Sequence, residues 1–368
     1  MKVLKFGGTS VGSAENIRNV ASIIQNIEGD KLLVLSAMSG VTNLLVELSS
    51  IVEQGDELKM DEILEALFLR HEQDIELLFN SVKDRNEIFD ILQAELSELR
   101  HLATQEFSKE IECRILTTGE TILTKIFSFY LTKNDISNRW LNARDFMQVA
   151  NLENPDTERV GNLLRSQLKS QAEESIYITQ GFVRINDRGE ISTLNRGGSD
   201  FTATIIGAAL NASEIQIWTD INGLHNNDPR VVENTFPVAQ LSFEEAAELA
   251  YFGAKILHPQ TISPVIDKNI PVFLKNTFKP SDPGTCISAI SETKGLKAIS
   301  AKDNITAIKI KSNRMLMAHG FLRKIFEVFD KYETAIDMIT TSEIAISLTI
   351  DNVSNLEPIL SELNAYGE

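Results

Sequence analysis

Near its N-terminus the chain reads Val3-Leu4-Lys5-Phe6-Gly7-Gly8-Thr9-Ser10, an apolar run that passes directly into two glycines and hydroxyl residues. A second stretch, Asn195-Arg196-Gly197-Gly198-Ser199-Asp200, repeats this arrangement. We expect a helix to open after each pair of glycines, so that free backbone N–H groups and a helix N-terminus face an anion such as phosphate. Two such loops, one with a lysine and one with an arginine and an aspartate, indicate a site for phosphoryl transfer.

The segments next to the first loop follow the order strand, polar turn, helix. Residues 3–6 and 32–35 are apolar runs typical of buried strands. Ser13 is expected to cap a helix whose apolar residues recur at helical spacing, and a second helix is expected around Thr42. This repeat predicts an α/β fold with an open, mostly parallel sheet sandwiched by helices. The two glycine loops should then converge at the carboxyl ends of the strands.

Apolar spacing predicts further elements along the chain. Residues 56–108 are expected to form amphipathic helices packed as a hairpin, and Thr117-Thr118-Gly119-Glu120 is expected to open another helix. Residues 186–189 are predicted to form a turn between strands at 176–179 and 191–193. The other predicted elements are helices at 200–211 and 243–252 and strands at 215–218 and 270–274. Pro271 indicates that the last of these, the expected final strand of its domain, lies at an edge or begins there.

The length of 368 residues predicts two domains. We expect a catalytic domain over 1–280, a linker over 281–300 and a second domain over 301–368. The second domain is predicted as strand, helix, strand, strand, helix, which is one strand short of the split βαβ pattern. Its final helix needs a sheet to cover, so the chain is expected to stop inside an incomplete domain.

The formal net charge of −17 argues against a nucleic-acid partner, and any phosphate site must be locally basic. Residues 53–110 hold 16 acidic and 6 basic side chains, for which a solvated helix face away from the glycine loops is the expected explanation. No apolar run is long enough to span a membrane, and no signal peptide is visible. Cys113 and Cys286 lack metal-ligand spacing and are expected to be reduced, structural residues of a cytoplasmic protein.

Seven motifs occur in a fixed order along the chain. They are Lys-Phe-Gly-Gly-Thr-Ser at 5–10, Gly-Val-Thr-Asn-Leu-Leu at 40–45, Thr-Gly-Glu at 118–120, Arg-Gly-Gly-Ser-Asp-Phe-Thr-Ala at 196–203, Trp-Thr-Asp at 218–220, Asp-Pro-Arg at 228–230 and Phe-Gly-Ala-Lys-Ile-Leu-His-Pro at 252–259. With this set the chain resembles the aspartate kinases of the amino-acid kinase family. It contains neither a P-loop motif nor the motif set of protein kinases. The resemblance implies the amino-acid kinase fold followed by a ferredoxin-like ACT domain.

The resemblance also implies an activity, namely transfer of the ATP γ-phosphoryl group to the β-carboxylate of L-aspartate, the first step toward lysine, threonine and methionine. Lys5, Asp200 and Lys255 are the implied catalytic residues. Lys5 would neutralise charge on the transferring group, and Asp200 would hold the lysines in place. The implied ATP-binding residues are Lys5, Gly7, Gly8, Ser10, Thr219, Asp220, His225, Arg230, Lys255 and Ile256. Mg²⁺ is expected to arrive with ATP and to need no metal site of its own.

An amino-acid substrate presents an ammonium group and carboxylates. Glu120 is the natural partner of the ammonium group, and Arg196 can bind the α-carboxylate with two parallel hydrogen bonds. The hydroxyl groups of Thr42 and Ser199 can bind the remaining oxygens. The substrate residues implied together are Thr42, Glu120, Arg196, Gly197, Gly198 and Ser199. A purely structural reading stays open for Glu120, because an acidic residue in the first turn also stabilises the helix that it opens.

The second domain resembles the ACT regulatory module of lysine-sensitive aspartate kinases. The implied effector-binding residues are Met315, Gly320, Phe321, Leu322, Ile336, Asp337, Ser342 and Glu343. A helix N-terminus can hold an α-carboxylate there, while Asp337 and Glu343 can attract an amine. L-Lysine is the expected effector, although Met317, Ala318 and Ala335 replace polar residues common in lysine-responsive relatives. The family implies a homodimer through these domains.

Two other functions stay open from the sequence. One is a kinase of the same fold acting on another acid, such as an N-acetylated glutamate, against which Glu120 argues because an acylated amine carries no positive charge. The other is an amino-acid sensor with an inactive kinase domain, against which Lys5, Asp200 and Lys255 argue. His225 stands where the family usually has a tyrosine, and it is either a nucleotide contact or an exposed loop residue.

Overall fold

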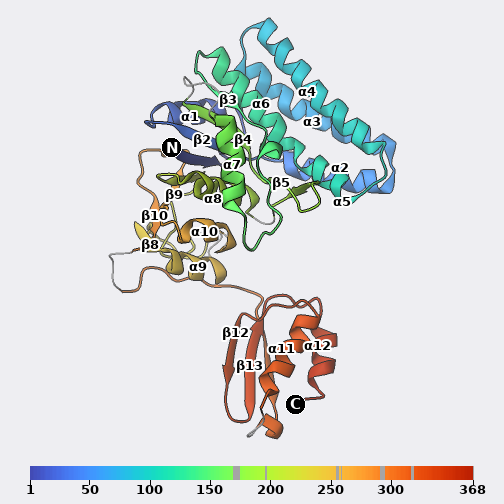
Figure 1. Ribbon diagram of the computed structural model, residues 1–368, viewed down its shortest axis with the longest axis vertical. Coiled ribbons are helices and arrows are strands. Elements are labelled where there is room, and N and C mark those ends of the chain that lie inside the picture. The colour runs from blue at the N-terminus through green and yellow to red at the C-terminus, as the bar shows by residue number, and fades with distance from the viewer. Residues whose placement is uncertain are drawn as a thin grey trace. The chain divides into compact units, whose positions relative to one another are not determined.

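The computed structural model describes residues 1–168, 175–194, 197–253, 257, 259–290, 295–315 and 319–367. The chain divides into two compact units, Met1–Ser300 and Ala301–Glu368 (Figure 1). The segment 281–300, predicted as a linker, is therefore part of the first unit. None of the described helices combines the length and the apolar character needed to cross a membrane.

An eight-stranded sheet runs through the first unit in the order β3-β4-β2-β1-β7-β9-β10-β8. Its strands are β1 (Lys2–Phe6), β2 (Lys31–Leu35), β3 (Arg139–Trp140), β4 (Ile176–Gln180), β7 (Ile215–Thr219), β8 (Gln240–Ser242), β9 (Val272–Asn276) and β10 (Thr285–Ser288). Neighbouring strands pair in parallel, except for the antiparallel pair of β9 and β10. The predicted α/β class with a mostly parallel sheet is confirmed.

Helices cover both faces of this sheet, because parallel strands need crossover connections. The helices that contribute to one core are α1 (Ala14–Gln25), α2 (Val41–Gln54), α3 (Glu57–Leu78), α4 (Val82–Ala103), α5 (Lys109–Leu116) and α6 (Thr118–Lys133), and those of the other are α7 (Thr157–Leu168), α8 (Gly198–Leu210), α9 (Phe243–Tyr251) and α10 (Pro259–Ile266). Leu4 and Phe6 of β1 belong to the first core and Val3 to the second. Since side chains alternate along a strand, Lys5 points toward the layer that contains α8.

Local sequence signals explain where several helices begin. Ser13 accepts a hydrogen bond from a backbone N–H of the first turn and caps α1, as predicted. Ser242 and Glu245 form a reciprocal capping box at the start of α9. The long helices α3 and α4 pack against each other, so the predicted helical hairpin is confirmed.

Two predictions about strands are wrong, and a third is confirmed in one of its alternatives. The turn at 186–189 joins β5 (Val183–Ile185) to β6 (Ile191–Thr193) in a separate two-stranded sheet, whereas residues 176–179 belong to β4 of the main sheet. Pro271 directly precedes β9, which is an interior strand, so of the two places expected for this proline the strand start is the one observed. The prediction that β9 is the last strand of its domain is wrong, because β10 follows it within the predicted linker. Strands of three or four residues, such as β5 and β10, carry too little periodicity to be recognised from sequence.

The second unit is a three-stranded antiparallel sheet in the order β11-β13-β12. Its elements are β11 (Thr306–Lys311), the short 3₁₀ turn Asn313–Met315, α11 (Phe321–Lys331), β12 (Met338–Thr341), β13 (Ala345–Ile350) and α12 (Leu356–Leu363). Both helices lie on one side of the sheet, where Ile325 and Ile359 pack with Ile308 and Leu348 (Figure 1). The predicted order strand, helix, strand, strand, helix is confirmed.

Candidate active site

Both glycine loops lie at the carboxyl edge of the main sheet. Gly8 follows β1, Ala37 follows β2 and Gly181 follows β4. The turns are packed closely, since a Cβ on Gly8 would lie 2.8 Å from the Ala37 carbonyl oxygen and one on Gly181 would lie 2.4 Å from Ser199 Oγ. Side chains at these glycines would force the loops apart. The structure therefore brings together the two segments that the sequence singles out.

An ion pair between Lys5 and Asp200 lies between the two loops. Lys5 Nζ is 2.7 Å from Asp200 Oδ1, and the two side chains are 12% and 14% exposed. Lys5 is held by β1, and Asp200 is held in the first turn of α8, so regular elements fix both partners. Because the pair is largely buried, salt screens it less than it screens a surface pair. Of the other predicted residues, Arg196, Lys255 and Ile256 lie outside the described residues.

Two helices begin at this edge without a side-chain cap. Gly40 precedes α2 with φ 86° and Gly197 precedes α8 with φ 74°, and neither glycine has a side-chain oxygen to cap the first turn of its helix. Thr42 is exposed in the first turn of α2, and Ser199 is half-buried in the first turn of α8. Uncapped N–H groups together with the helix dipole favour an anion at each of these positions.

The sequence also predicts that the N-terminus of α1 faces an anionic ligand. Unlike the N-termini of α2 and α8, however, this one is bound by a side chain of the protein. The backbone N–H of Ala14 donates to Asp74 Oδ1 at 2.7 Å, so a carboxylate from α3 already lies at this helix terminus. The prediction for this helix terminus is wrong, because a partner distant in sequence occupies the position. In the loop itself, the N–H groups of Gly8 and Thr9 have no acceptor within the part of the chain that the structure describes.

Glu120 is a buried carboxylic acid in the first turn of α6, with 4% of the residue exposed. Burial raises the pKa of its carboxyl group to about 7, and hydrogen bonds from the backbone N–H groups of Glu120 and Ala37 offset only part of this effect. Its Oε2 atom has no hydrogen-bond partner among the described residues. Ala37 also contacts Gly119, so Glu120 lies beside the turn that follows β2. An unpartnered buried carboxyl oxygen at this place is suited to a cationic ligand group.

Gln180 is a buried polar residue near Glu120 that the sequence pattern does not single out. It is buried at the end of β4, where its side-chain oxygen accepts from the Ala143 N–H at 2.8 Å and its Nε2 donates to Thr124 Oγ1 at 2.9 Å. The Thr124 hydroxyl donates to the carbonyl oxygen of Glu120 at 2.8 Å. Gln180 thus connects the sheet edge to the helix turn that carries Glu120. The only sequence signal for it is the polar pair Thr179-Gln180 at the end of a buried strand.

Three of the predicted nucleotide residues, Ser10, Thr219 and Asp220, lie in the loop after β1 or at the end of β7. Ser10 is fully buried, and its hydroxyl group lies 2.6 Å from Thr277 Oγ1, so the structure directs it into the protein and not toward a ligand. Thr219 donates its hydroxyl hydrogen to Asp220 Oδ1 at 3.0 Å, and Asp220 is exposed. Of these residues, Thr219 and Asp220 are the ones that a nucleotide could reach.

His225 and Arg230 lie in the loop between β7 and β8. His225 is half-buried, with Nδ1 2.9 Å from Thr235 Oγ1. Arg230 is exposed and its Nη2 pairs with Asp228 Oδ2 at 2.6 Å. Both side chains contact residues of their own loop. Their contacts with a nucleotide stay a prediction.

In the second unit the predicted effector residues are dispersed. Gly320 precedes α11 with φ 77°, and Phe321 is buried whereas Leu322 is exposed. Asp337 Oδ1 lies 3.3 Å from Lys302 Nζ. The carboxylate that was predicted to attract the amine of an effector is therefore paired with a lysine of the chain itself. Ser342 and Glu343 lie in the exposed turn between β12 and β13, Ile336 is half-buried ahead of β12, and Met315 ends the 3₁₀ turn.

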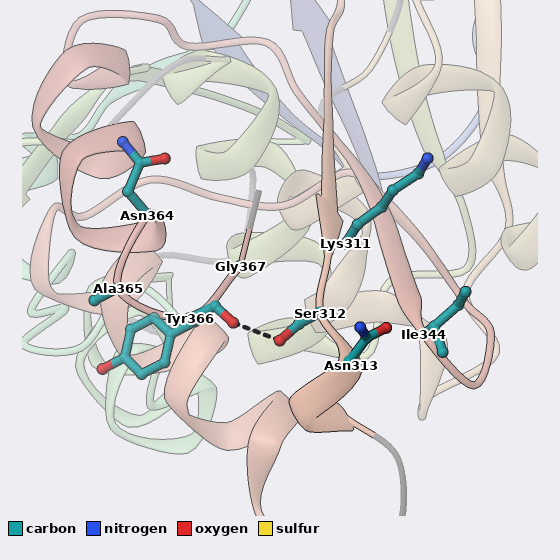
Figure 2. A pocket seen from close by; sticks show the side chains of 8 residues that line it. All are labelled: Lys311, Ser312, Asn313, Ile344, Asn364, Ala365, Tyr366 and Gly367. Carbon is teal, nitrogen blue, oxygen red and sulfur yellow. Dashed lines mark hydrogen bonds between the residues drawn. The ribbon is translucent and has the colours of Figure 1, made fainter.

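A cavity of about 430 Å³ lies at one end of the second unit, where the chain after α12 comes beside the end of β11 (Figure 2). The Ser312 hydroxyl group donates to the Tyr366 carbonyl oxygen across this junction at 2.6 Å. The lining residues are Lys311, Ser312, Asn313, Ile344, Asn364, Ala365, Tyr366 and Gly367. None of the predicted effector residues is among them, so their role stays a prediction.

The sheet order and the lysine–aspartate pair at its carboxyl edge define a kinase of the amino acid kinase class, and residues 1–276 match the family model described as "Amino acid kinase family". The chain is 36% identical over 360 residues to lysine-sensitive aspartokinase 3 of Escherichia coli, covering 96% of this chain and 79% of that protein. It is 36% identical over 372 residues to chloroplastic aspartokinase 1 of Arabidopsis thaliana, covering 95% of this chain but 63% of the relative. The chain belongs to the amino acid kinase family, and within it to the aspartokinases.

Solved structures agree with this assignment. Escherichia coli aspartokinase III in complex with aspartate and ADP, called the R-state, matches with a TM-score of 0.84 at 33% identity, over 100% of this chain and 84% of that one. The same enzyme in complex with lysine and aspartate, called the T-state, matches with a TM-score of 0.81 at 33% identity over the same shares.

Proposed function

We propose that the chain transfers the γ-phosphoryl group of ATP to the β-carboxylate of L-aspartate and releases 4-phospho-L-aspartate and ADP. The observation that carries this proposal is the buried ion pair of Lys5 and Asp200 beside the uncapped N-terminus of α8. The aspartokinase relatives and the solved complex with aspartate and ADP support the choice of substrates. The product is an activated acid, consistent with the implied place at the start of lysine, threonine and methionine synthesis.

The reaction needs positioning and charge neutralisation more than proton transfer. A β-carboxylate oxygen attacks the γ-phosphorus while the bond to the β-phosphate oxygen breaks and ADP leaves. A carboxylate is already ionised at neutral pH, so no general base is required. Lys5 lies where it can neutralise the charge that develops on the phosphoryl oxygens, and Asp200 holds its ammonium group in place. Lys255 is proposed to reach the nucleotide phosphates.

Substrate recognition is assigned to the groups around the turn after β2. The unpartnered Oε2 of Glu120 would accept a hydrogen bond from the substrate ammonium group. The buried carboxylate, which is unfavourable when it is alone, would then be part of an ion pair. The N-termini of α2 and α8, with Thr42 and Ser199, offer hydrogen bonds to oxygens of the substrate or the phosphoryl group. Arg196 is proposed to bind the α-carboxylate.

Mg²⁺ is assigned no ligand from this chain. Among the described residues there is no group of three or more His, Cys, Asp or Glu side chains that could hold a metal ion. Mg²⁺ is proposed to arrive bound to the ATP phosphates, where it would neutralise charge on the nucleotide and would not require such a group.

Regulation by L-lysine is proposed for the second unit, because a lysine-sensitive relative covers nearly the whole chain. A homodimer through these units is proposed as well. β12 is an edge strand that is exposed along its whole length, and Met338 and Ile339 on it are apolar. Such an edge is a template for pairing with another strand. The free thiols Cys113 and Cys286 suit the cytoplasmic location that we also propose.

The test is hydroxylamine trapping of the acyl phosphate with MgATP and L-aspartate, in the presence and absence of L-lysine. Lys5→Ala is expected to lower kcat by about a hundredfold to a thousandfold, the usual loss for one oxyanion-stabilising donor. Lys2→Ala is the matched control, because Lys2 lies on the same strand but pairs with Glu214, at 3.4 Å, away from Asp200. It should keep wild-type kcat.

Other outcomes would point to the alternatives. Product with another acid but not with aspartate would keep the kinase and reject the substrate. No product with any acid, together with binding of an amino acid to the second unit, would favour the sensor. Lysine inhibition would support the regulatory proposal, and its absence would reject it without touching the kinase.

A further inference from the structure

Arg70 and Asp74 lie one turn apart on α3, a helix to which no substrate contact is assigned. Arg70 Nη1 contacts Asp74 Oδ2 at 2.6 Å, and the two side chains are 26% and 10% exposed. Asp74 Oδ1 accepts the Ala14 N–H at 2.7 Å. Arg70 Nη2 donates to the Gly12 carbonyl oxygen at 2.7 Å, and its Nε lies 3.4 Å from the Ser39 carbonyl oxygen. From a third element, the pair therefore reaches both the loop after β1 and the loop after β2.

The two loops held in this way are those proposed to surround the phosphoryl group. A Cβ on Gly12 would lie 2.9 Å from the Gly8 carbonyl oxygen and 3.2 Å from Ser39 Oγ, so Gly12 packs between the loops. Gly8 and Thr9 carry the N–H groups that lack an acceptor among the described residues. Gly40, next to Ser39, begins α2 with its uncapped N-terminus. A shift at Gly12 or Ser39 would therefore move the proposed phosphate contacts.

The geometry of the guanidinium group makes this arrangement rigid. Its N–H donors point in fixed directions within one plane. The contacts of Nη1 with Asp74 and of Nη2 with Gly12 therefore also set the direction in which Nε points toward Ser39. Asp74 in turn is held by the Ala14 N–H, and its charge is favourable at the start of α1. A lysine, with one nitrogen, cannot reproduce this set of contacts.

We propose that Arg70 and Asp74 are positioning residues that hold the two loops at one fixed separation, so that the N–H groups near Gly8 and the start of α2 meet the same phosphoryl group. The proposal rests on the proposed function, since it assumes that these loops bind phosphate. Stabilisation by fixed N–H dipoles depends on their placement, and a misplacement of about 1 Å can cost about a hundredfold in rate. The pair therefore acts on kcat through the loops and not by touching substrate.

The experiment measures kcat and the KM values for ATP and L-aspartate in the full chain. Arg70→Ala should lower kcat by about a hundredfold. Arg70→Lys and Asp74→Asn should have kcat values between those of Arg70→Ala and the wild-type protein. The aspartate KM should stay within about threefold, because uniform substrate binding is not removed. Arg100→Ala is the matched control, since Arg100 pairs at 2.7 Å with Asp61 on the same helix α3 and both are exposed. Its kcat should be unchanged.

A second readout separates positioning from folding. Hydrogen exchange by mass spectrometry should show faster exchange in Arg70→Lys for peptides spanning 7–14 and 36–42, with unchanged exchange in 57–60 and an unchanged thermal midpoint. Normal kcat in Arg70→Ala, or a kcat loss that only parallels a lower thermal midpoint, would overturn the proposal. An inactive wild-type protein would instead reject the proposed function. In that case, faster exchange of the two loops in Arg70→Lys would still show that Arg70 and Asp74 hold them together, and unchanged exchange would show that they do not.

Discussion

Changing Glu120 to Gln removes a buried charge but keeps the size of the side chain. The carboxyl group of Glu120 has its pKa raised to about 7 by burial, so near pH 6 only about one molecule in ten carries the charge that would bind the substrate ammonium group. The apparent KM for aspartate scales inversely with the competent fraction. In the wild-type protein it should therefore be about tenfold higher at pH 6 than at pH 8.

Glu120→Gln should abolish this pH dependence and weaken aspartate binding at every pH. Removing one partner of a buried ion pair costs about 3–5 kcal/mol, which corresponds to an increase of at least about a hundredfold in the aspartate KM. The assay is initial-rate kinetics with saturating MgATP from pH 6 to 8. Glu47→Gln, an exposed residue of α2, is the control and should keep the wild-type profile.

The stability of Glu120→Gln distinguishes substrate binding from a purely structural role of Glu120, because the two roles predict changes of opposite sign in the free energy of unfolding. A carboxyl group whose folded pKa is raised stabilises the fold at low pH, and this contribution is lost as pH rises from about 4.5 through 7. Glu120→Gln should therefore raise the free energy of unfolding at pH 8, by up to about 3 kcal/mol. If Glu120 served only to stabilise the first turn of α6, the variant would be less stable and its KM unchanged. That pair of results would refute the reasoning.

Three further predictions concern buried groups. Burial lowers the pKa of His71 to about 4, so between pH 6.5 and 4 the unfolded chain binds a proton at this residue and the folded chain does not. Acidification over this range should therefore lower the free energy of unfolding, measured with urea, by up to about 3 kcal/mol more in the wild-type protein than in His71→Leu. Thr277→Val should destabilise by about 1–3 kcal/mol, because the buried Ser10 hydroxyl group keeps only its long 3.4 Å contact with the Trp218 carbonyl oxygen, and adding Ser10→Ala should recover part of this loss in a double-mutant cycle. Gly198→Ala places a Cβ 2.4 Å from Phe182 Cδ2 at the start of α8, and it should lower kcat with a destabilisation of about 1–3 kcal/mol by thermal unfolding.

The sequence predicted the elements whose signals are local and strong. The first strand, the Ser13 cap and the helical hairpin each depend on residues within one or two turns of each other. The approach of Lys5 and Asp200 was also foreseeable, because a parallel sheet collects the carboxyl ends of its strands at one edge. Apolar periodicity and topology rules were sufficient for this part.

The missed features depend on tertiary partners that composition does not reveal. Residues 53–110 were interpreted as a solvated acidic face, yet Asp74 is only 7% exposed and bonds to the start of α1. A charge count gives no information about which carboxylate finds a partner distant in sequence. Likewise β10 has four residues and was hidden in a Pro/Gly-rich stretch, although pairing with β9 and β8 makes it part of the sheet.

The position of β1 in the middle of the sheet has a consequence for biosynthesis. Its partner β2 follows it closely along the chain, but its other partner, β7, lies about 200 residues further on. At about 5–20 residues per second, that edge stays without its partner for roughly 10–40 s on the ribosome. Apart from Trp218, the described members of the core around α1–α6 all precede residue 179, whereas the opposite core needs residues up to Ile287. One layer of the enzyme can therefore be assembled while the other is still being translated.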